Sequence, residues 1–209
     1  LVGSEMCIRD SIKYRIRGEI KMEEKVTINI SARHVHLTKE DIDKLFGHHL
    51  HVKRMLNQVG QYAAEEVVTI INGDKKIENV RVIGPERKYN QVEISACDAR
   101  LLGIKPPVRK SGNLDGAEMI TIETERGAIT GNFAIIAERH VHFSPSDALK
   151  YNVEDGELLK LEIGGIKPGE IEVHAKVSDN GFYEVHLDTD DANAFLINPG
   201  AVSYTHLRA

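Results

Sequence analysis

The chain contains one short phrase twice, written ARHVHLTKEDIDKLFG at residues 32–47 and ERHVHFSPSDALKYNVEDG at residues 138–156. Both histidines of the second phrase follow those of the first at the same distance of 106 residues, since 140 − 34 equals 142 − 36. In both copies the pair continues the mainly apolar face of an alternating segment, at 26–37 and at 133–143. We therefore expect two strands whose imidazoles point inward at the strand end.

A helix start follows each histidine pair. Thr38 precedes Asp41, and Ser144 precedes Pro145 and Asp147. A hydroxyl side chain accepts hydrogen bonds from the free N–H groups of a first helical turn, and proline and acidic residues favour the same turn. The pattern predicts a short helix directly after each strand.

The similarity between the two parts of the chain resumes further on, in two segments that lie 93 residues apart: QVEISACDARLLGI (91–104) and EVHLDTDDANAFLI (184–197). Ser95 and Asp188 both stand where a helix needs an N-cap, and Glu93 falls opposite His186. We expect two half-chains of similar plan, built from an internal repeat. Each half has a strand with an H-x-H pair, a helix, further strands and a second capped helix.

Each half offers three side chains that bind divalent metals. Residues i and i+2 of a strand project to the same side and can hold one ion together. Imidazole nitrogen and carboxylate oxygen suit zinc or a similar ion, and three protein ligands leave a coordination position open for catalysis. The predicted ligands are His34, His36 and Glu93 in the first half and His140, His142 and His186 in the second.

Other candidate residues have no counterpart in the repeat. His48, His49 and His51 form the dense segment GHHLH, which we interpret as a solvated loop or helix end. His174 lies in an alternating segment and is expected at the surface. Cys97 could be an acyl-transfer nucleophile, but aspartate takes its place in the other half, which favours a small, partly buried helix residue.

Length and composition limit the class of protein. A chain of 209 residues can form one large or two small domains with a core. The net charge of −5 argues against a nucleic-acid-binding protein, and no apolar run is long enough to cross a membrane. Two cysteines provide no disulfide framework, so a reducing compartment is expected.

The two ends of the chain are expected to lie outside the fold. LVGSEMCIRDS (1–11) and VSYTHLRA (202–209) are typical of translated sequencing adapters, so Cys7 and His206 are expected to carry no chemistry. Met22 is the expected start, although isoleucines at every fourth position of 12–20 also fit a targeting helix. The expected segments are a terminal extension (1–24), a first half (25–105), a connector with the first strand of the second half (106–131), a second half (132–201) and a second extension (202–209).

Basic residues gather before the ligand strand and in the connector. Arg87 stands six residues before Glu93, where a guanidinium could grip phosphate in a bidentate fashion. Arg109, Lys110 and Ser111 follow two prolines in the connector. No glycine-rich phosphate loop is present, which argues against ATP and NAD.

Taken together, these motifs resemble the phosphate propanoyltransferases, the PduL-type phosphotransacylases. The resemblance covers residues 25–201 and is carried by SARHVHL, GPERKYNQVEIS, LGIKPPVRKSGNLDG, ERHVHFSP and EVHLDTDDANAF. It implies a mainly β fold with two small β-barrels capped by short helices, and two zinc ions per chain between them. It also implies transfer of a propanoyl or acetyl group between coenzyme A and phosphate.

By position, the resemblance assigns both predicted ligand sets to zinc and Arg87 to the phosphoryl group. Arg109, Lys110 and Ser111 are then candidates for binding coenzyme A or phosphate. Glu86 beside Arg87, and Asn90 where threonine is common, depart from the usual pattern and put phosphate affinity in doubt. A metal-bound thiol is deprotonated at neutral pH, so coenzyme A can act as a nucleophile without a catalytic cysteine.

Two other functions fit the same residues. A zinc-dependent hydrolase would activate water in place of the thiol, and a non-catalytic module would use the metals only to join two barrels. Relatives are commonly homodimers. With a start at Met22, a cytoplasmic location is favoured over the lumen of a bacterial microcompartment, where some relatives are directed by an N-terminal peptide and can meet the shell.

Overall fold

The computed structural model of the chain describes residues 24–198 and 202–206. Within these residues the protein is mainly β, with short helices, as expected. Six strands form a closed barrel in the order β1 (Glu24–Ser31), β13 (Glu184–Asp188), β10 (His140–Phe143), β12 (Gly169–Val177), β11 (Leu158–Ile163) and β14 (Val202–His206).

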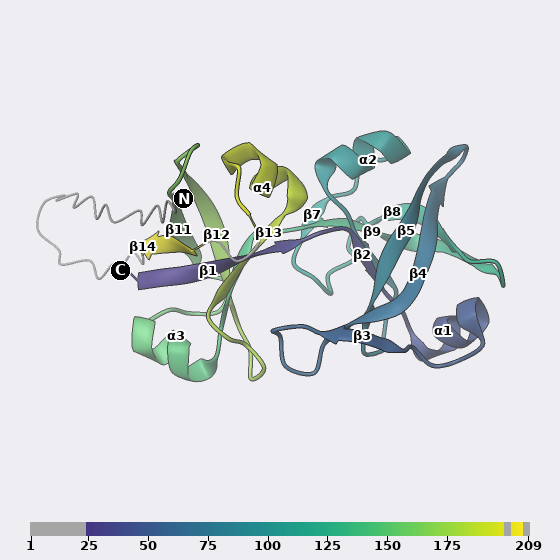
Figure 1. Cartoon of the computed structure of the whole chain (residues 1–209), viewed down its shortest axis with the longest axis horizontal. Helices are drawn as coiled ribbons and strands as arrows, with labels where there is room; N and C mark the ends of the chain where they lie inside the picture. Colours follow the sequence, from purple (N-terminus) through teal and green to yellow (C-terminus); the bar gives the residue numbers. More distant parts are fainter. Residues whose placement is uncertain (1–23, 199–201, 207–209) are drawn as a thin grey trace, which may run out of the picture.

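The other strands form a curled sheet beside the barrel (Figure 1). Its order is β3 (Val52–Met55), β4 (Tyr62–Asn72), β5 (Lys75–Gly84), β2 (His34–His36), β6 (Gln91–Glu93), β9 (Ala128–Ala137) and β7 (Val108–Arg109). A further strand, β8 (Glu118–Glu123), pairs with both β4 and β9, so the sheet curls back on itself. The expectation of two barrels is therefore corrected to one closed barrel and one curled sheet.

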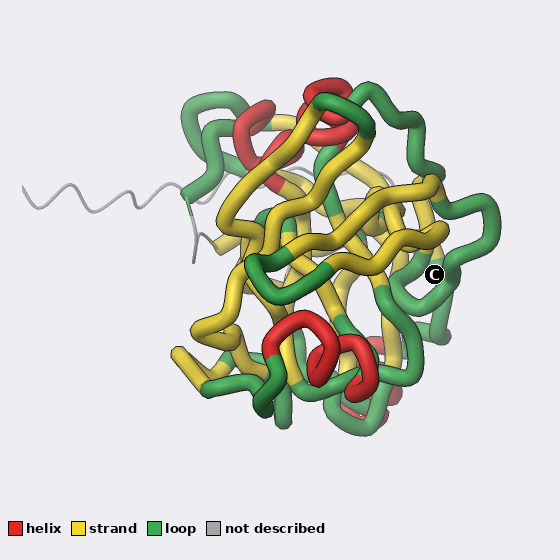
Figure 2. The backbone as a smooth tube through the Cα atoms, turned by 90° about the vertical axis from the view of Figure 1, so that its right-hand side faces the viewer, coloured by secondary structure: helices red, strands yellow, loops and turns green. Residues whose placement is uncertain are grey.

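Short helices follow the strands that carry the histidines and their partners. They are α1 (Lys39–Phe46), α2 (Ala96–Leu102), α3 (Pro145–Tyr151) and α4 (Thr189–Phe195). The predicted N-caps are confirmed: Thr38, Ser95, Ser144 and Asp188 each accept a hydrogen bond from the backbone N–H three residues later. Figure 2 shows the helices on the outside of the strands, at opposite margins.

The segment expected as one strand before each histidine pair is broken into two. The strand is interrupted at residues 32–33, between β1 and β2, and at residues 138–139, between β9 and β10. Consequently β1 pairs with β13 and β14 in the barrel, whereas β2 pairs with β5 and β6 in the curled sheet. In the same way β9 pairs with β6 in the sheet, and β10 pairs with β12 and β13 in the barrel.

Strand pairing thus departs from the expected segment boundaries. The first strand of the expected first half lies in the barrel, and β9, which opens the expected second half, lies in the curled sheet. Residues 202–206, expected as part of an extension, form β14 and pair with β1 and β11. The expectations for residues 1–23, including the start at Met22, lie outside the described residues.

Each sheet encloses its own apolar core. The core of the curled sheet gathers residues of its strands with Ile42 and Leu45 of α1 and Leu102 of α2. The barrel core is built around Phe143 and includes Val26 and Ile28 of β1. β1 therefore contributes to the barrel core, although the chain runs directly from β1 into the curled sheet.

Candidate metal centre and active-site pocket

The first predicted ligand set lies together at the junction of β2 and β6. His34 is directly opposite Glu93 in the antiparallel register of these strands, and His36 projects to the same side two residues later. His34 Nε2 is 3.6 Å from Glu93 Oε2, and one donor atom from each of the three residues lies within 4.8 Å of the others. All three side chains are buried.

In both His34 and His36 a hydrogen bond occupies Nδ1 and leaves Nε2 free. His34 Nδ1 lies 2.9 Å from the carbonyl oxygen of Ala32, and His36 Nδ1 lies 3.0 Å from that of Ile83. A carbonyl oxygen only accepts, so each Nδ1 carries the proton in the neutral ring and Nε2 keeps its lone pair. Metal-binding histidines are commonly held in this way.

The second predicted set, His140, His142 and His186, forms an equivalent cluster in the barrel. His140 faces His186 in the register of β10 and β13, and its Nδ1 donates to the Glu138 carbonyl oxygen at 2.8 Å. His140 Nε2 and His142 Nε2 are 3.1 Å apart. One donor atom from each histidine lies within 4.8 Å of the others.

Two nitrogen atoms of this second cluster give the clearest evidence in favour of a metal site. His142 Nδ1 and His186 Nε2 are buried and have no hydrogen-bond partner among the described residues. Buried polar atoms without a partner are costly, unless a bound group meets them. Three converging imidazoles with a free nitrogen fit a borderline divalent ion such as zinc.

Burial keeps the rings of His36, His140 and His142 in the neutral form that a metal requires. It lowers the pKa of His36 to about 3, and the charge of His34 adds to this effect. Burial also lowers the pKa of His140 to about 3 and that of His142 to about 2. Metal binding therefore needs no release of protons from these three rings at neutral pH.

Glu93 is held in its ionised form by its surroundings. Burial by itself raises the pKa of Glu93, but His34 and His36, with a hydrogen bond to Ser111 and the nearby His140, outweigh it and lower that pKa to about 2. Gln91 Nε2 donates to Glu93 Oε1 at 2.5 Å and also to Ser111 Oγ at 2.9 Å. Gln91 Oε1 in turn accepts from the Gly112 N–H at 2.8 Å, so the connector loop is tied to the ligand carboxylate.

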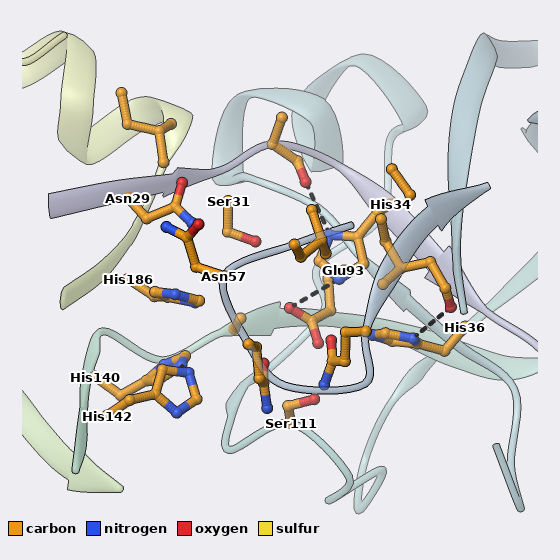
Figure 3. A pocket seen from close by; sticks show the side chains of 18 of the residues that line it. Asn29, Ser31, His34, His36, Asn57, Glu93, Ser111, His140, His142 and His186 are labelled. Atoms are coloured by element: carbon orange, nitrogen blue, oxygen red, sulfur yellow. Dashed lines mark hydrogen bonds and ion pairs between the residues drawn. The ribbon is translucent and has the colours of Figure 1, made fainter. Parts of the chain in front are cut away.

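Both clusters open into one cavity of about 860 Å³ between the barrel and the curled sheet. Figure 3 shows the three histidines of the barrel on one side and His34, His36 and Glu93 on the other. The volume falls within the range of sites that hold small molecules and cofactors. All six predicted ligands are among the residues that line this cavity.

Arg87 lines this cavity and is anchored beside the first cluster. Its backbone N–H donates to the Leu37 carbonyl oxygen at 2.8 Å, directly after the strand that bears His36. Its guanidinium Nη1 lies 3.5 Å from the Tyr89 hydroxyl, and its charge helps to lower the pKa of His36. The predicted phosphate-binding residue is therefore in the same cavity as the predicted ligands.

Lys176 is a further cation of the cavity, which Arg33, Lys53, Arg54 and Arg81 also line, and the sequence interpretation missed it. It lies on β12 opposite His142 and is partly buried. Burial lowers the pKa of Lys176, and the charges of Arg87 and Lys110 add to this, whereas Glu93 opposes it. Alternation along β12 could have placed Lys176 on a face, but only the strand pairing shows which face lines the cavity.

The three residues of the connector lie differently. Ser111 lines the cavity, whereas Arg109 and Lys110 are not among its lining residues. Arg109 donates to the carbonyl oxygens of Asp115 and Val108, at 2.8 and 2.9 Å, and so holds its own loop. Lys110 forms an exposed ion pair of 3.0 Å with Asp155 of the barrel part.

An arginine precedes each histidine pair and binds the aspartate in the first turn of a helix. Arg33 contacts both carboxylate oxygens of Asp98 at 2.9 and 2.7 Å, and Arg139 contacts both oxygens of Asp191 at 2.8 and 2.7 Å. Such two-point pairs are directional. They fix α2 against the interruption before β2, and α4 against the interruption before β10.

The two residues that depart from the family pattern, Asn90 and Glu86, have structural or solvent-exposed positions. Asn90 is buried, accepts from the Thr38 N–H at 2.9 Å and donates to Asp41 at 2.6 Å, so it holds the first turn of α1. Glu86 is exposed. Neither is among the residues that line the cavity.

The interpretation of Cys97 needs correction, whereas that of the GHHLH histidines is confirmed. Cys97, expected to be partly buried, is exposed on α2, and its hydrogen bond to Asp190 raises the pKa of its thiol, which disfavours a nucleophilic role. His48, His49 and His51 are exposed in the segment after α1, which confirms the expected solvated segment, and His48 and His51 lie beside the buried carboxylate of Glu66. The sequence showed no link between these histidines and a residue on β4.

The fold and the site together define a mainly β protein in which two buried clusters of metal-binding side chains share one cavity with arginine and lysine. A sequence profile of the phosphate propanoyltransferase family matches residues 27–198. The chain belongs to this family, which confirms the resemblance found in the sequence, and the enzyme is an acyltransferase.

Individual relatives are similar over most of their length. A phosphate propanoyltransferase of Thermotoga maritima is 42% identical over 94% of this chain and 98% of its own. Those of Clostridioides difficile and Salmonella typhimurium are 40% and 42% identical, over 88% and 81% of this chain and 90% and 82% of theirs. None of the described helices has the length and apolar character needed to cross a membrane.

Proposed function

We propose that this protein is a phosphotransacylase that transfers a propanoyl or acetyl group reversibly between coenzyme A and phosphate. One observation supports this more than any other: two metal-binding clusters, Arg87 and Lys176 line the same cavity. Family membership supports the reaction class. The reaction is acyl-CoA plus phosphate giving acyl phosphate plus coenzyme A.

We assign one zinc ion to each cluster. His34, His36 and Glu93 would hold the first, and His140, His142 and His186 the second. The free Nε2 atoms of the first pair and the unpartnered nitrogens of the second support this assignment. When bound, such ions supply Lewis acidity to a thiol, a carbonyl oxygen or a phosphate oxygen.

The protein's own cations are assigned to the phosphate. In the direction of acyl-CoA formation, a bond forms between the thiolate sulfur and the acyl carbon, and the bond from that carbon to the phosphate oxygen breaks. Negative charge collects on the departing phosphate, where the Arg87 guanidinium offers two parallel donors. Lys176 adds a point charge in the same cavity, and Ser111 lies at its wall.

The remaining expectations about the site and the chain belong to the same proposal. Parallel and antiparallel neighbours recur around β2 and β10, which supports an internal repeat in which the two halves exchange their first strands.

Arg109 and Lys110 are kept as candidates for the outer part of coenzyme A. We further propose a cytoplasmic homodimer, to be checked by light scattering and cell fractionation.

The test is an assay of the purified chain with acetyl, propanoyl and butanoyl phosphate, with and without coenzyme A, alongside elemental analysis. We expect acyl-CoA to form in step with phosphate release, and at least two equivalents of zinc per chain. The rival hydrolase would release phosphate at the same rate without the thiol. That outcome, or transfer that survives complete removal of the metal, would overturn the proposal.

A further inference from the structure

A third group of metal-binding side chains lies outside the cavity, in the segment between α1 and β4. It consists of His48, His51 and Glu66, and one donor atom from each lies within 4.8 Å of the others. His51 Nδ1 is 2.7 Å and His48 Nδ1 is 3.7 Å from Glu66 Oε1. None of the three lines the cavity of the proposed active site.

The carboxylate of this group is aimed inward by an irregularity in β4. The pairing of β4 with β5 shifts register between Ala63 and Val67, so the alternation of buried and exposed residues is interrupted there. Irregularities of this kind re-aim a side chain. Arg81 donates to the carbonyl oxygens of Ala64 and Glu65 at 3.0 and 2.8 Å, which holds the irregular segment in place.

Glu66 is the buried member of the group, with only 7% of its side chain exposed. Both of its oxygens accept from the His51 backbone N–H, at 3.2 and 3.1 Å, and its ion-pair partners in the described part of the chain are imidazoles. A buried carboxylate is stabilised by a positive partner. A divalent cation bound between the two rings would supply that charge.

The histidines are the accessible members. The side chains of His48 and His51 are 48% and 63% exposed, and their ring centroids are 5.0 Å apart. An ion at this place would meet two imidazoles and one carboxylate, with its remaining positions open to water. This donor set suits zinc, cobalt or nickel and disfavours magnesium and calcium, which prefer oxygen.

We propose that His48, His51 and Glu66 form a third site for a borderline divalent metal, separate from the catalytic cavity. A metal bound there joins the segment after α1 to β4, because His51 precedes β3 and Glu66 lies within β4. The site would therefore stabilise this corner of the curled sheet by mass action whenever the ion is available. It requires no contact with the substrates.

The test compares bound zinc in the full chain and its variants, by equilibrium dialysis against buffered Zn²⁺ followed by elemental analysis. The double variant His48→Ala/His51→Ala and the single variant Glu66→Gln are each expected to bind one equivalent fewer than the unaltered chain. The matched control is His49→Ala, which removes the neighbouring exposed histidine outside the group and is expected to lose none. Circular dichroism verifies that each variant is folded.

The zinc content of each variant is compared with that of the unaltered chain, so the metals of the cavity contribute equally to both. A failure of the proposed catalytic function would therefore not change this difference in zinc content. Transfer activity is expected to stay unchanged in all three variants. Equal zinc content in the unaltered chain and the double variant would overturn the third site. An equal loss in His49→Ala, or full binding by Glu66→Gln, would overturn it as well, because binding would then be diffuse or independent of the carboxylate.

Discussion

At the scale of single residues, the site combines neutral rings with fixed cations. Burial lowers the pKa of His36, His140 and His142 so far that proton binding is disfavoured, and the Nδ1 atoms of His34, His36 and His140 are occupied by backbone carbonyl oxygens. Arg87 and Lys176 add positive charge to the same cavity. Metal binding and phosphate binding can therefore be separated by changing the cations and leaving the rings intact.

Arg87→Ala and Lys176→Met are expected to lower kcat/KM for phosphate and acyl phosphate while the metal content is retained. Loss of one hydrogen-bonded charge costs about 1.5–3 kcal/mol, which corresponds to a fall of roughly 10- to 100-fold in kcat/KM. Steady-state kinetics with varied acyl phosphate measure this change.

Arg100→Ala on the outside of α2 and Lys167→Met between β11 and β12 are the matched controls, because both side chains are exposed and lie away from the cavity. Unchanged kinetics in Arg87→Ala would refute its assignment to the phosphate. Loss of zinc from Arg87→Ala or Lys176→Met would show that the cation removed stabilises the metal clusters and does not bind the substrate.

At the scale of elements, each strand that bears a histidine pair is positioned by a helix that starts elsewhere in the chain. Ser95 and Asp98 form a reciprocal capping pair at the start of α2, and Asp98 also binds Arg33 next to His34. Asp188, Asp191 and Arg139 form the corresponding group at the start of α4. Helix capping and the placement of the ligand strands thus depend on the same aspartates.

Asp98→Ala is expected to lower the free energy of unfolding by about 2 kcal/mol, since it removes a cap contact and a charge-assisted pair in one step. Urea denaturation measures the loss. Asp43→Ala is the control, because that side chain is exposed on α1 and its change is expected to stay within about 0.5 kcal/mol. If both variants unfold at the same urea concentration, the Arg33–Asp98 pair contributes nothing to the fold.

At the scale of the whole molecule, the two sheets are joined by strands that cross between them. β1 closes the barrel, although the residues that follow it belong to the curled sheet, and β9 lies in the curled sheet before the chain returns to the barrel. Asn57 of the curled part donates to Glu184 of β13 at 3.1 Å, and the Cys97 N–H donates to Asp190 of α4 at 2.8 Å. The cavity with both clusters lies at this joint.

A fragment of residues 132–206 is therefore expected not to fold by itself. It lacks β1, so β13 and β14 lose a paired neighbour and the barrel core loses Val26 and Ile28. Circular dichroism and thermal melting are expected to show no cooperative transition, whereas an excess of the separate peptide 24–33 restores one by binding the folded form. Cooperative melting of the fragment alone would mean that the barrel does not depend on β1.

Much of the local structure, and the members of both clusters, followed from the sequence. Helix caps depend on contacts three residues apart, so Thr38, Ser95, Ser144 and Asp188 could be recognised from spacing alone. The histidine pairs project together because they lie two residues apart on a strand. Their third partners were found because the similarity between the two parts of the chain aligned Glu93 with His186.

The tertiary structure alone decided which strand joins which sheet, and with it the cavity. Backbone pairing between strands distant in sequence has no local signal, so the placement of β1 in the barrel and of β9 in the curled sheet, the curled sheet itself and the strand at 202–206 were not foreseen. The same reason applies to Lys176, to Glu184 near His186, and to the meeting of Glu66 with His48 and His51. Residue types and short spacings determine what each segment can do, whereas long-range pairing determines which segments do it together.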